Sequence, residues 1–236
     1  MSKAIPLRSL PRIFVPGADP SETIDLPKPE LDKLRKVLRL SPGAQVAILP
    51  NDGSLVRCEL ETHSARPLEV LYPDTEPRLR LTLAQALPKG DKLDEIIRSC
   101  TEIGVSRFLL FPSERTIVRW DEKKTRDRLA RLETIAREAA EVSFRTKLPT
   151  IELAKDLAGV LRAEPDAVVL SEIEGLSRSL QPREGTMTIV VGPEGGWAGR
   201  ELKLIGDRGI SLGPRVLRVD HAGAAAAAIL LLGGQA

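Results

Sequence analysis

Residues 190–202 read VVGPEGGWAGREL and pass from an apolar run through a glycine turn into a charged segment. The apolar run begins upstream at TMTIVV, residues 186–191, and is typical of a strand that is buried on both faces. GRELKLIGDRG, residues 199–209, has the spacing of a helix. Buried strands that alternate with helices form a parallel sheet. This segment therefore predicts an α/β fold.

The same alternation extends in both directions, from residue 78 to the C-terminal end. Further strands are predicted at RLRLTLAQAL (78–87), VSRFLLF (105–111), DAVVLS (166–171) and ISLG (210–213). Helices are predicted at DKLDEIIRSCTEIG (91–104), which Gly104 ends, at KKTRDRLARLETIAREAAEV (123–142), and from Ala222 onward. We expect an α/β domain whose parallel sheet is covered by helices on both faces.

The N-terminal part has a different pattern, with short strands at RIFV (12–15), AQVAIL (44–49) and LVRCEL (55–60). Pro50-Asn51-Asp52-Gly53 separates the last two and is a hairpin signal, because Asn, Asp and Gly tolerate a positive φ. PELDKLRKVLRLSPG (29–43) predicts a short helix with Leu31, Leu34 and Leu38 on one side. We expect a small β-barrel at 1–74, a linker near YPDTEP (72–77), and an α/β domain at 75–236.

The composition excludes several classes of protein. The 236 residues hold 35 Lys and Arg against 33 Asp and Glu, so a net charge of +2 only faintly favours nucleic acid as a partner. Cys58 and Cys100 are far apart in the chain and are accompanied by only two histidines, so they lack the ligand spacing of the usual four-ligand zinc site and give no disulfide framework; we expect no metal and a cytoplasmic location. The N-terminus lacks a secretory signal and the longest apolar run, 222–232, is too short to cross a bilayer, so we expect a soluble protein.

Two glycine loops follow predicted strands, at 192–196 and at SLGPRVLR (211–218). Ligands of open parallel sheets bind at the carboxyl ends of strands, and glycine there lets a ligand approach the backbone. Neither loop has the Gly-Lys-Ser/Thr of a P-loop or the spacing G-x-G-x-x-G, which argues against a phosphate cradle. We therefore expect the two loops to share one pocket for a less anionic ligand; plain turns that serve only the fold are the alternative.

The chain resembles a known family in blocks that run nearly from end to end. GPEGGW followed by EL, then SLGPRVLR and an alanine-rich last helix, resemble the bacterial 16S ribosomal RNA uracil-N3 methyltransferases of the RsmE type, which belong to the SPOUT class. Further similar blocks, in the same order, are PRIFVPG, KVLRLSPG, LPKGDKLDEII, TEIGVSRFLLFPSERT and AREAAEVSFR. The resemblance implies an N-terminal PUA-like β-barrel that binds RNA and a C-terminal SPOUT domain with a trefoil knot. It also implies a homodimer that acts on 16S ribosomal RNA of the small subunit.

The cofactor that the resemblance implies is S-adenosylmethionine, whose positive sulfonium and neutral adenine suit a pocket made of backbone groups. Three loops are expected to hold it, with glycines that allow close approach and leucines that pack on the adenine. The expected cofactor residues are Leu170, Ser171, Glu172, Val191, Gly192, Pro193, Glu194, Gly195, Gly196, Trp197, Leu212, Gly213, Arg215, Leu217 and Arg218.

Removal of the uracil N3 proton and stabilisation of the resulting charge require a base and a cation. The catalytic candidates are Arg145 and Arg218, followed by Glu141 and Glu102. Glu141 and Arg145 are four residues apart, so an ordinary helix salt bridge is the alternative for that pair. Residues 115–147 hold ten Lys and Arg against six Asp and Glu, which favours contacts with the phosphate backbone of RNA. The expected RNA-binding residues are Arg12, Lys33, Arg35, Lys36, Arg39, Arg115 and Arg145.

Several positions depart from the family pattern. Val219-Asp220-His221 stands where the family usually reads Thr-Glu-Thr, and Asp220 is expected to be the N-cap of the last helix. Val142 and Phe144 replace a polar residue and a glycine. Two alternatives to the uracil-N3 methyltransferase follow: a catalytically degenerate RNA-binding or ribosome-assembly factor of the same fold, and an RNA methyltransferase with another target base.

Overall fold

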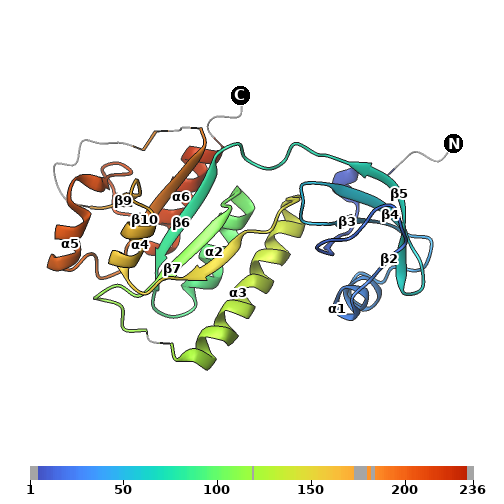
Figure 1. Cartoon of the computed structure of the whole chain (residues 1–236), viewed down its shortest axis with the longest axis horizontal. Helices are drawn as coiled ribbons and strands as arrows, with labels where there is room; N and C mark the ends of the chain where they lie inside the picture. The colour runs from blue at the N-terminus through green and yellow to red at the C-terminus, as the bar shows by residue number, and fades with distance from the viewer. Residues whose placement is uncertain (1–4, 119, 173–179, 182–183, 233–236) are drawn as a thin grey trace. The chain divides into compact units, whose positions relative to one another are not determined.

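The computed structural model describes residues 5–118, 120–172, 180–181 and 184–232. The chain divides into two compact units, residues 1–76 with 140–148, and residues 77–139 with 149–236. Each unit has its own sheet (Figure 1). The last three residues of a long helix thus belong to the first unit, although the rest of that helix belongs to the second.

The first unit contains a five-stranded sheet in the order β1-β3-β4-β5-β2. Its strands are β1 (Arg12–Phe14), β2 (Ile24–Asp25), β3 (Gln45–Leu49), β4 (Leu55–Leu60) and β5 (Ser64–Leu71). β1 is parallel to β3, and the other pairs are antiparallel. The predicted hairpin joins β3 to β4, with φ of 72° at Asn51 and 107° at Gly53. No strand was predicted at β2 or β5.

The helical segment of the first unit is shorter and less regular than its leucine spacing predicts. A single turn η1 (Leu7–Ser9) precedes the sheet, and α1 (Lys28–Asp32) continues into the π-helix η2 (Lys33–Val37). Leu34 is fully buried, as expected. Leu38, predicted on the same side of the helix, lies just past the end of η2 and is 41% exposed, so the helix does not extend far enough to include it.

The second unit contains a six-stranded sheet in the order β11-β9-β10-β6-β7-β8. Every pair is parallel, as the alternating pattern predicts. The strands are β6 (Arg80–Ala86), β7 (Arg107–Phe111), β8 (Thr150–Leu153), β9 (Val168–Leu170), β10 (Thr186–Val191) and β11 (Gly209–Ile210). Because the strands are parallel, their carboxyl ends lie at one edge of the sheet.

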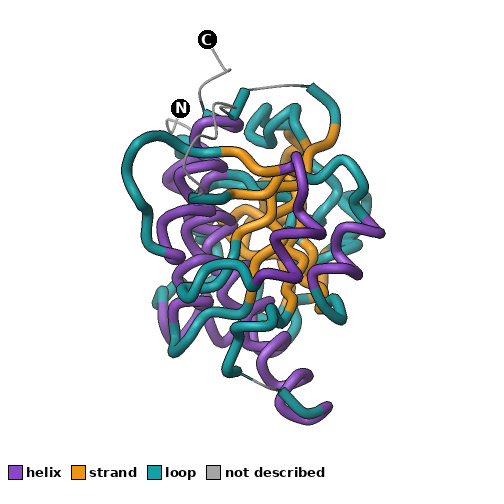
Figure 2. The backbone as a smooth tube through the Cα atoms, turned by 90° about the vertical axis from the view of Figure 1, so that its left-hand side faces the viewer, coloured by secondary structure: helices purple, strands orange, loops and turns teal. Residues whose placement is uncertain are grey.

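Helices cover both faces of this sheet (Figure 2). Side chains of α2 (Lys92–Ile103), α3 (Glu122–Val142) and α6 (Val219–Leu231) form one core with Leu81 and Leu83. Those of α4 (Leu157–Ala163) and α5 (Gly199–Ile205) form the other. Gly104 ends α2 with φ of 115°, as predicted. No strand was predicted at β8 and no helix at α4.

The last helix begins earlier than expected. α6 starts at Val219 with Arg218 as its N-cap, so Asp220 is the second helical residue and the predicted N-cap is wrong. The Asp220 carboxylate instead accepts a hydrogen bond from Arg218 Nε at 3.2 Å. None of the helices in the described part of the chain is long and apolar enough to cross a membrane.

Candidate functional site

A cavity of about 1060 Å³ lies at the carboxyl edge of the six-stranded sheet, beyond the ends of β9, β10 and β11. Its walls come from the loops at 170–172, 191–197 and 211–218 and from the start of α6. Every predicted cofactor residue except Gly195 lines it. The structure therefore brings together the two glycine loops that the sequence analysis expected to share one pocket.

Trp197 fixes the first glycine loop against the sheet. It is 8% exposed, its ring stacks on Phe111 with centroids 6.4 Å apart, and its Nε1 donates to the Leu170 carbonyl at 3.1 Å. A Cβ on Gly192 would lie 2.9 Å from the Trp197 ring. Gly192 is thus required because the indole ring occupies the space that a side chain would need.

The second glycine loop leaves backbone open. Gly213 has φ of 127°, and a Cβ there would meet no heavy atom within 4 Å. Ser211 Oγ accepts the Gly213 N–H at 3.1 Å and donates to the Gly213 carbonyl at 3.0 Å. Gly196, with φ of 68°, is also open on the Cβ side. A ligand can therefore approach the main chain closely on both loops.

Glu194 and Lys92 form an ion pair within the cavity lining. Glu194 Oε1 accepts from Lys92 Nζ at 2.8 Å and from the Lys89 N–H at 3.1 Å. Partial burial alone would raise the pKa of Glu194, but these hydrogen bonds and the lysine charge outweigh it, so the pKa lies below its usual value. Glu194 is therefore ionised at neutral pH. Lys92 was not predicted, because nothing in the chain pattern places α2 beside this loop.

Arg218 lines the cavity and has an exposed side chain that pairs with Asp220. The pKa of Asp220 lies below its usual value: desolvation raises it, but its own backbone N–H and Arg218 lower it further. His221 is 68% exposed, with Nε2 3.8 Å from the Asp220 carboxylate. Of the four catalytic candidates, Arg218 alone is among the residues that line the cavity.

Arg145 and Glu141 belong to the first unit, and both are buried. Phe144 adopts φ of 65° and α3 ends at Val142, so Arg145 lies beyond the helix. Its Nη2 donates to Glu76 at 2.8 Å. Glu141 accepts from the Phe14 N–H at 3.1 Å and pairs with Lys33. A helix salt bridge between these two residues was the alternative to catalysis; the structure shows for each of them a partner that is distant in the sequence.

Glu141 has a pKa above its usual value, because burial outweighs the opposing effects of Lys33 and the Phe14 N–H. Glu102, the remaining catalytic candidate, is exposed in the last turn of α2. All residues that line the cavity belong to the second unit, and neither Glu102 nor Glu141 is among them. Catalysis by Glu102, Glu141 or Arg145 stays a prediction, without support from the cavity.

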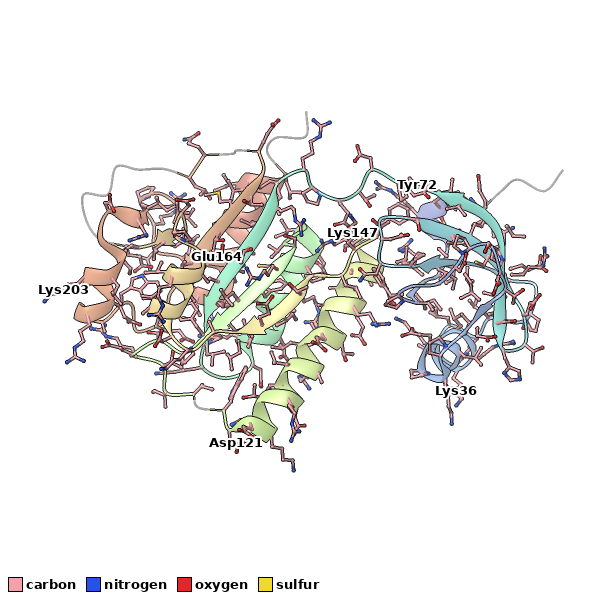
Figure 3. All side chains as sticks on the ribbon, viewed as in Figure 1. Lys36, Tyr72, Asp121, Lys147, Glu164 and Lys203 are labelled. Carbon is pink, nitrogen blue, oxygen red and sulfur yellow. The ribbon has the colours of Figure 1, made fainter. Side chains whose placement is uncertain are left out.

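The expected RNA-binding residues of the first unit differ in their hydrogen-bond partners and in their exposure to solvent. Arg12 Nε donates to the Glu141 carbonyl at 2.7 Å, and Arg35 Nη2 donates to the Glu61 carbonyl at 2.8 Å. Burial lowers the pKa of Arg12, although the Glu141 charge opposes this. Lys36 and Arg39 are exposed, and Figure 3 shows Lys36 extending away from the helical segment. Among the described residues, Lys36 forms only an exposed ion pair with Asp32 at 2.9 Å, so Lys36 and Arg39 are the better placed for phosphate contacts.

The two cysteines are buried thiols. Burial raises the pKa of both Cys58 and Cys100 to about 12, so neither is a thiolate at neutral pH. Within the described ranges, no group of three or more His, Cys, Asp or Glu side chains is arranged to hold a metal ion.

The parallel sheet and the glycine-lined cavity at its carboxyl edge define an α/β protein that binds a small ligand at the ends of its strands. Residues 75–231 match the family of the RNA methyltransferase domain. Ribosomal RNA small subunit methyltransferase E of Bacillus subtilis is 30% identical over 85% of this chain and 86% of its own length. The Synechocystis protein of the same name is 34% identical over 83% of this chain and 68% of its own.

Among solved structures, the ribosomal RNA small subunit methyltransferase E of Neisseria gonorrhoeae, bound to S-adenosyl methionine, is similar with a TM-score of 0.83 and 29% identity. The similarity covers 93% of this chain and 96% of that one. This chain belongs to the RNA methyltransferases and, among them, to the family of ribosomal RNA small subunit methyltransferase E.

Proposed function

We infer that this protein is an S-adenosylmethionine-dependent methyltransferase of small-subunit ribosomal RNA, and we propose that its target is N3 of one uridine. Membership of the methyltransferase E family supports the enzyme class and the RNA. The single structural observation that carries the proposal is the cavity in which the loops at 170–172, 191–197 and 211–218 meet.

The cavity fits the cofactor in its chemistry. Open backbone at Gly196 and Gly213 suits a neutral adenosine, and Leu170, Leu212 and Leu217 offer apolar surface for the adenine. The ionised carboxylate of Glu194 suits a nearby positive charge. When bound, S-adenosylmethionine supplies an electrophilic methyl group. The residues proposed to hold it are those that were expected from the sequence; Gly195 is the one that does not line the cavity, and its carbonyl accepts a hydrogen bond from Arg115.

Arg218 is the proposed catalytic cation. Loss of the N3 proton leaves negative charge on the uracil oxygens, which a guanidinium donor stabilises. Arg218 has an exposed side chain on the cavity wall, and Asp220 holds it at Nε. Its Nη groups therefore remain positioned to donate hydrogen bonds to a uracil oxygen.

The proposed organisation has two parts. The five-stranded sheet at the N-terminal end is proposed to be a PUA-like barrel that binds RNA, with the domain boundary near residue 74. The C-terminal part is proposed to be a knotted SPOUT domain that forms a homodimer. In support of the knot, β11 lies at the sheet edge while α6, which follows it, packs against α2, β6 and β10. In support of pairing, Val216 and Ile229 are exposed apolar side chains.

The decisive experiment uses small subunits from cells that lack the modification, incubated with the protein and labelled cofactor. Mapping of the labelled nucleoside is expected to give 3-methyluridine at one position. A label on another base would change the target but keep the class, and binding of subunits without labelling would indicate an assembly factor. Arg218→Ala is expected to lower the rate about 100-fold or more, as loss of a charge-stabilising donor does.

A further inference from the structure

Glu201 joins two loops at the carboxyl edge of the sheet. Its side chain is almost fully buried, at 3% exposure, in the first turn of α5. Oε2 accepts the Ala198 N–H at 2.9 Å and the Ser113 hydroxyl at 3.2 Å, while Oε1 accepts the Glu114 N–H at 3.0 Å. One carboxylate thus connects the glycine loop after β10 to the loop after β7.

The loop after β7 is held by further hydrogen bonds. The Ser113 N–H donates to Thr116 Oγ1 at 3.0 Å, and the Arg115 N–H donates to Ser113 Oγ at 3.3 Å. These contacts fix the backbone on both sides of Arg115. The backbone from which the Arg115 side chain extends is therefore held by the network that includes Glu201.

Arg115 lies along the glycine loop and lines the cavity. Its Nη1 donates to the Gly195 carbonyl, and a Cβ on Gly195 would lie 3.6 Å from Arg115 Cδ. Of the four cations that line the cavity, Lys92 is paired with Glu194, Arg218 is paired with Asp220, and Arg215 is exposed and forms no ion pair with a described residue. Arg115 forms no ion pair with any residue that the structure describes, so its other guanidinium donors remain available to a ligand.

We propose that Arg115, positioned by Glu201, binds the carboxylate of the amino-acid part of the cofactor. The inference rests on the proposed function, because it needs S-adenosylmethionine or its product in the cavity. That carboxylate is the one anionic group of the cofactor. A guanidinium binds a carboxylate through two parallel hydrogen bonds, which gives orientation as well as affinity.

The test compares two ligands by calorimetry: S-adenosylhomocysteine, which carries the carboxylate, and 5′-methylthioadenosine, which lacks the amino-acid part. The wild-type protein is expected to prefer the former. Arg115→Ala is expected to weaken S-adenosylhomocysteine binding about tenfold or more, the usual effect of losing a charged hydrogen bond, while methylthioadenosine changes about twofold or less. Arg115→Lys is expected to be intermediate.

Glu201→Gln tests the positioning role. It is expected to lower the preference for S-adenosylhomocysteine less than Arg115→Ala does, and the double variant is expected to resemble Arg115→Ala alone, because both act on one contact. Glu164→Gln is the matched control. Glu164 is a carboxylate of the same unit that binds Arg107 and Thr188, and it is not among the cavity residues. This control is expected to lower the melting temperature and keep the ligand preference.

The possible results distinguish failure of the Arg115 proposal from failure of the proposed function. If the wild-type protein binds neither ligand, the proposed function fails. If it binds both and Arg115→Ala leaves the preference intact, the inference is overturned. Loss of preference in Arg215→Ala instead would assign the carboxylate to Arg215. Weaker binding of small subunits by Arg115→Ala, with normal S-adenosylhomocysteine affinity, would assign Arg115 to RNA; either result overturns the proposal.

Discussion

Gly192 shows how a single missing side chain shapes the cavity. The Trp197 ring fills the position of its absent Cβ, and the same ring connects the glycine loop to Leu170 and Phe111. The close approach at Gly192 thus holds the loop in place, whereas the open backbone of Gly196 and Gly213 is accessible to a ligand.

We therefore expect Gly192→Ala to displace Trp197. The free energy of unfolding should fall by about 1–3 kcal/mol, as overpacking of a well-filled site does. S-Adenosylhomocysteine affinity should fall with it. Urea denaturation and calorimetry measure the two effects. Gly199→Ala is the control: a Cβ there meets no atom within 4 Å, and Gly199 begins α5, so stability should stay equal or rise by up to about 1 kcal/mol.

The raised pKa of Glu141 predicts how the free energy of unfolding changes with pH. Burial raises its pKa above the ordinary value of 4.5, so the folded protein holds the proton more tightly than the unfolded chain. Its contribution to stability is therefore complete below about pH 4.5 and is lost as the pH rises through the raised pKa. Glu141→Gln removes this dependence.

The measurement is the free energy of unfolding from pH 4 to 7, for the wild type minus Glu141→Gln. The difference should decline as the pH rises. A difference that is flat or increases with pH would show that the Lys33 pair outweighs burial and that the pKa of Glu141 is not raised.

At the scale of elements, Arg12 is a cap for the C-terminus of α3. Its Nε donates to the carbonyl of Glu141, in the last turn, and its guanidinium lies 5.0 Å from the centre of the Phe144 ring. A cation at this end also complements the helix dipole. The role follows from a contact between residues 129 positions apart, which the helix pattern cannot reveal.

Arg12→Ala should lower the free energy of unfolding by about 1–3 kcal/mol, because it leaves carbonyl groups at the helix end without their charged donor. Lys36→Ala should change it by less than about 0.5 kcal/mol, as an exposed surface substitution does. Chemical denaturation compares the two. Equal effects would mean that Arg12 does not stabilise the end of α3.

At the scale of the whole molecule, a net charge of +2 leaves no strong general attraction to RNA, so binding must depend on local cations. We expect the association constant for small subunits to fall steeply with salt, since phosphate contacts release counterions. Binding of S-adenosylhomocysteine should change far less. Lys36→Ala should reduce the salt slope by about 1, and an unchanged slope would exclude a phosphate contact at Lys36.

The sequence predicted best where the pattern is local. The hairpin at Asn51 and Gly53, the end of α2 at Gly104 and the parallel strands β6, β7, β9 and β10 all depend on residues near in the chain. The predictions were wrong where a long-range contact determines the local structure. Asp220 was expected to cap α6, but the N-cap is Arg218, two residues earlier, and Asp220 pairs with that arginine.

By itself, the sequence determined the α/β class and the two glycine loops, because hydrophobic periodicity and turn residues are properties of neighbouring positions. It determined the family through the similarity of whole sequence blocks. Only the tertiary structure decided which charged groups meet. Lys33 and Glu141 are 108 positions apart, and Arg145 and Glu76 are 69. The place of Arg115 on the cavity wall likewise depends on the hydrogen bonds of Glu201, 87 and 88 residues from its partners in the β7 loop. Such pairings follow from strand order and burial, which no local pattern encodes.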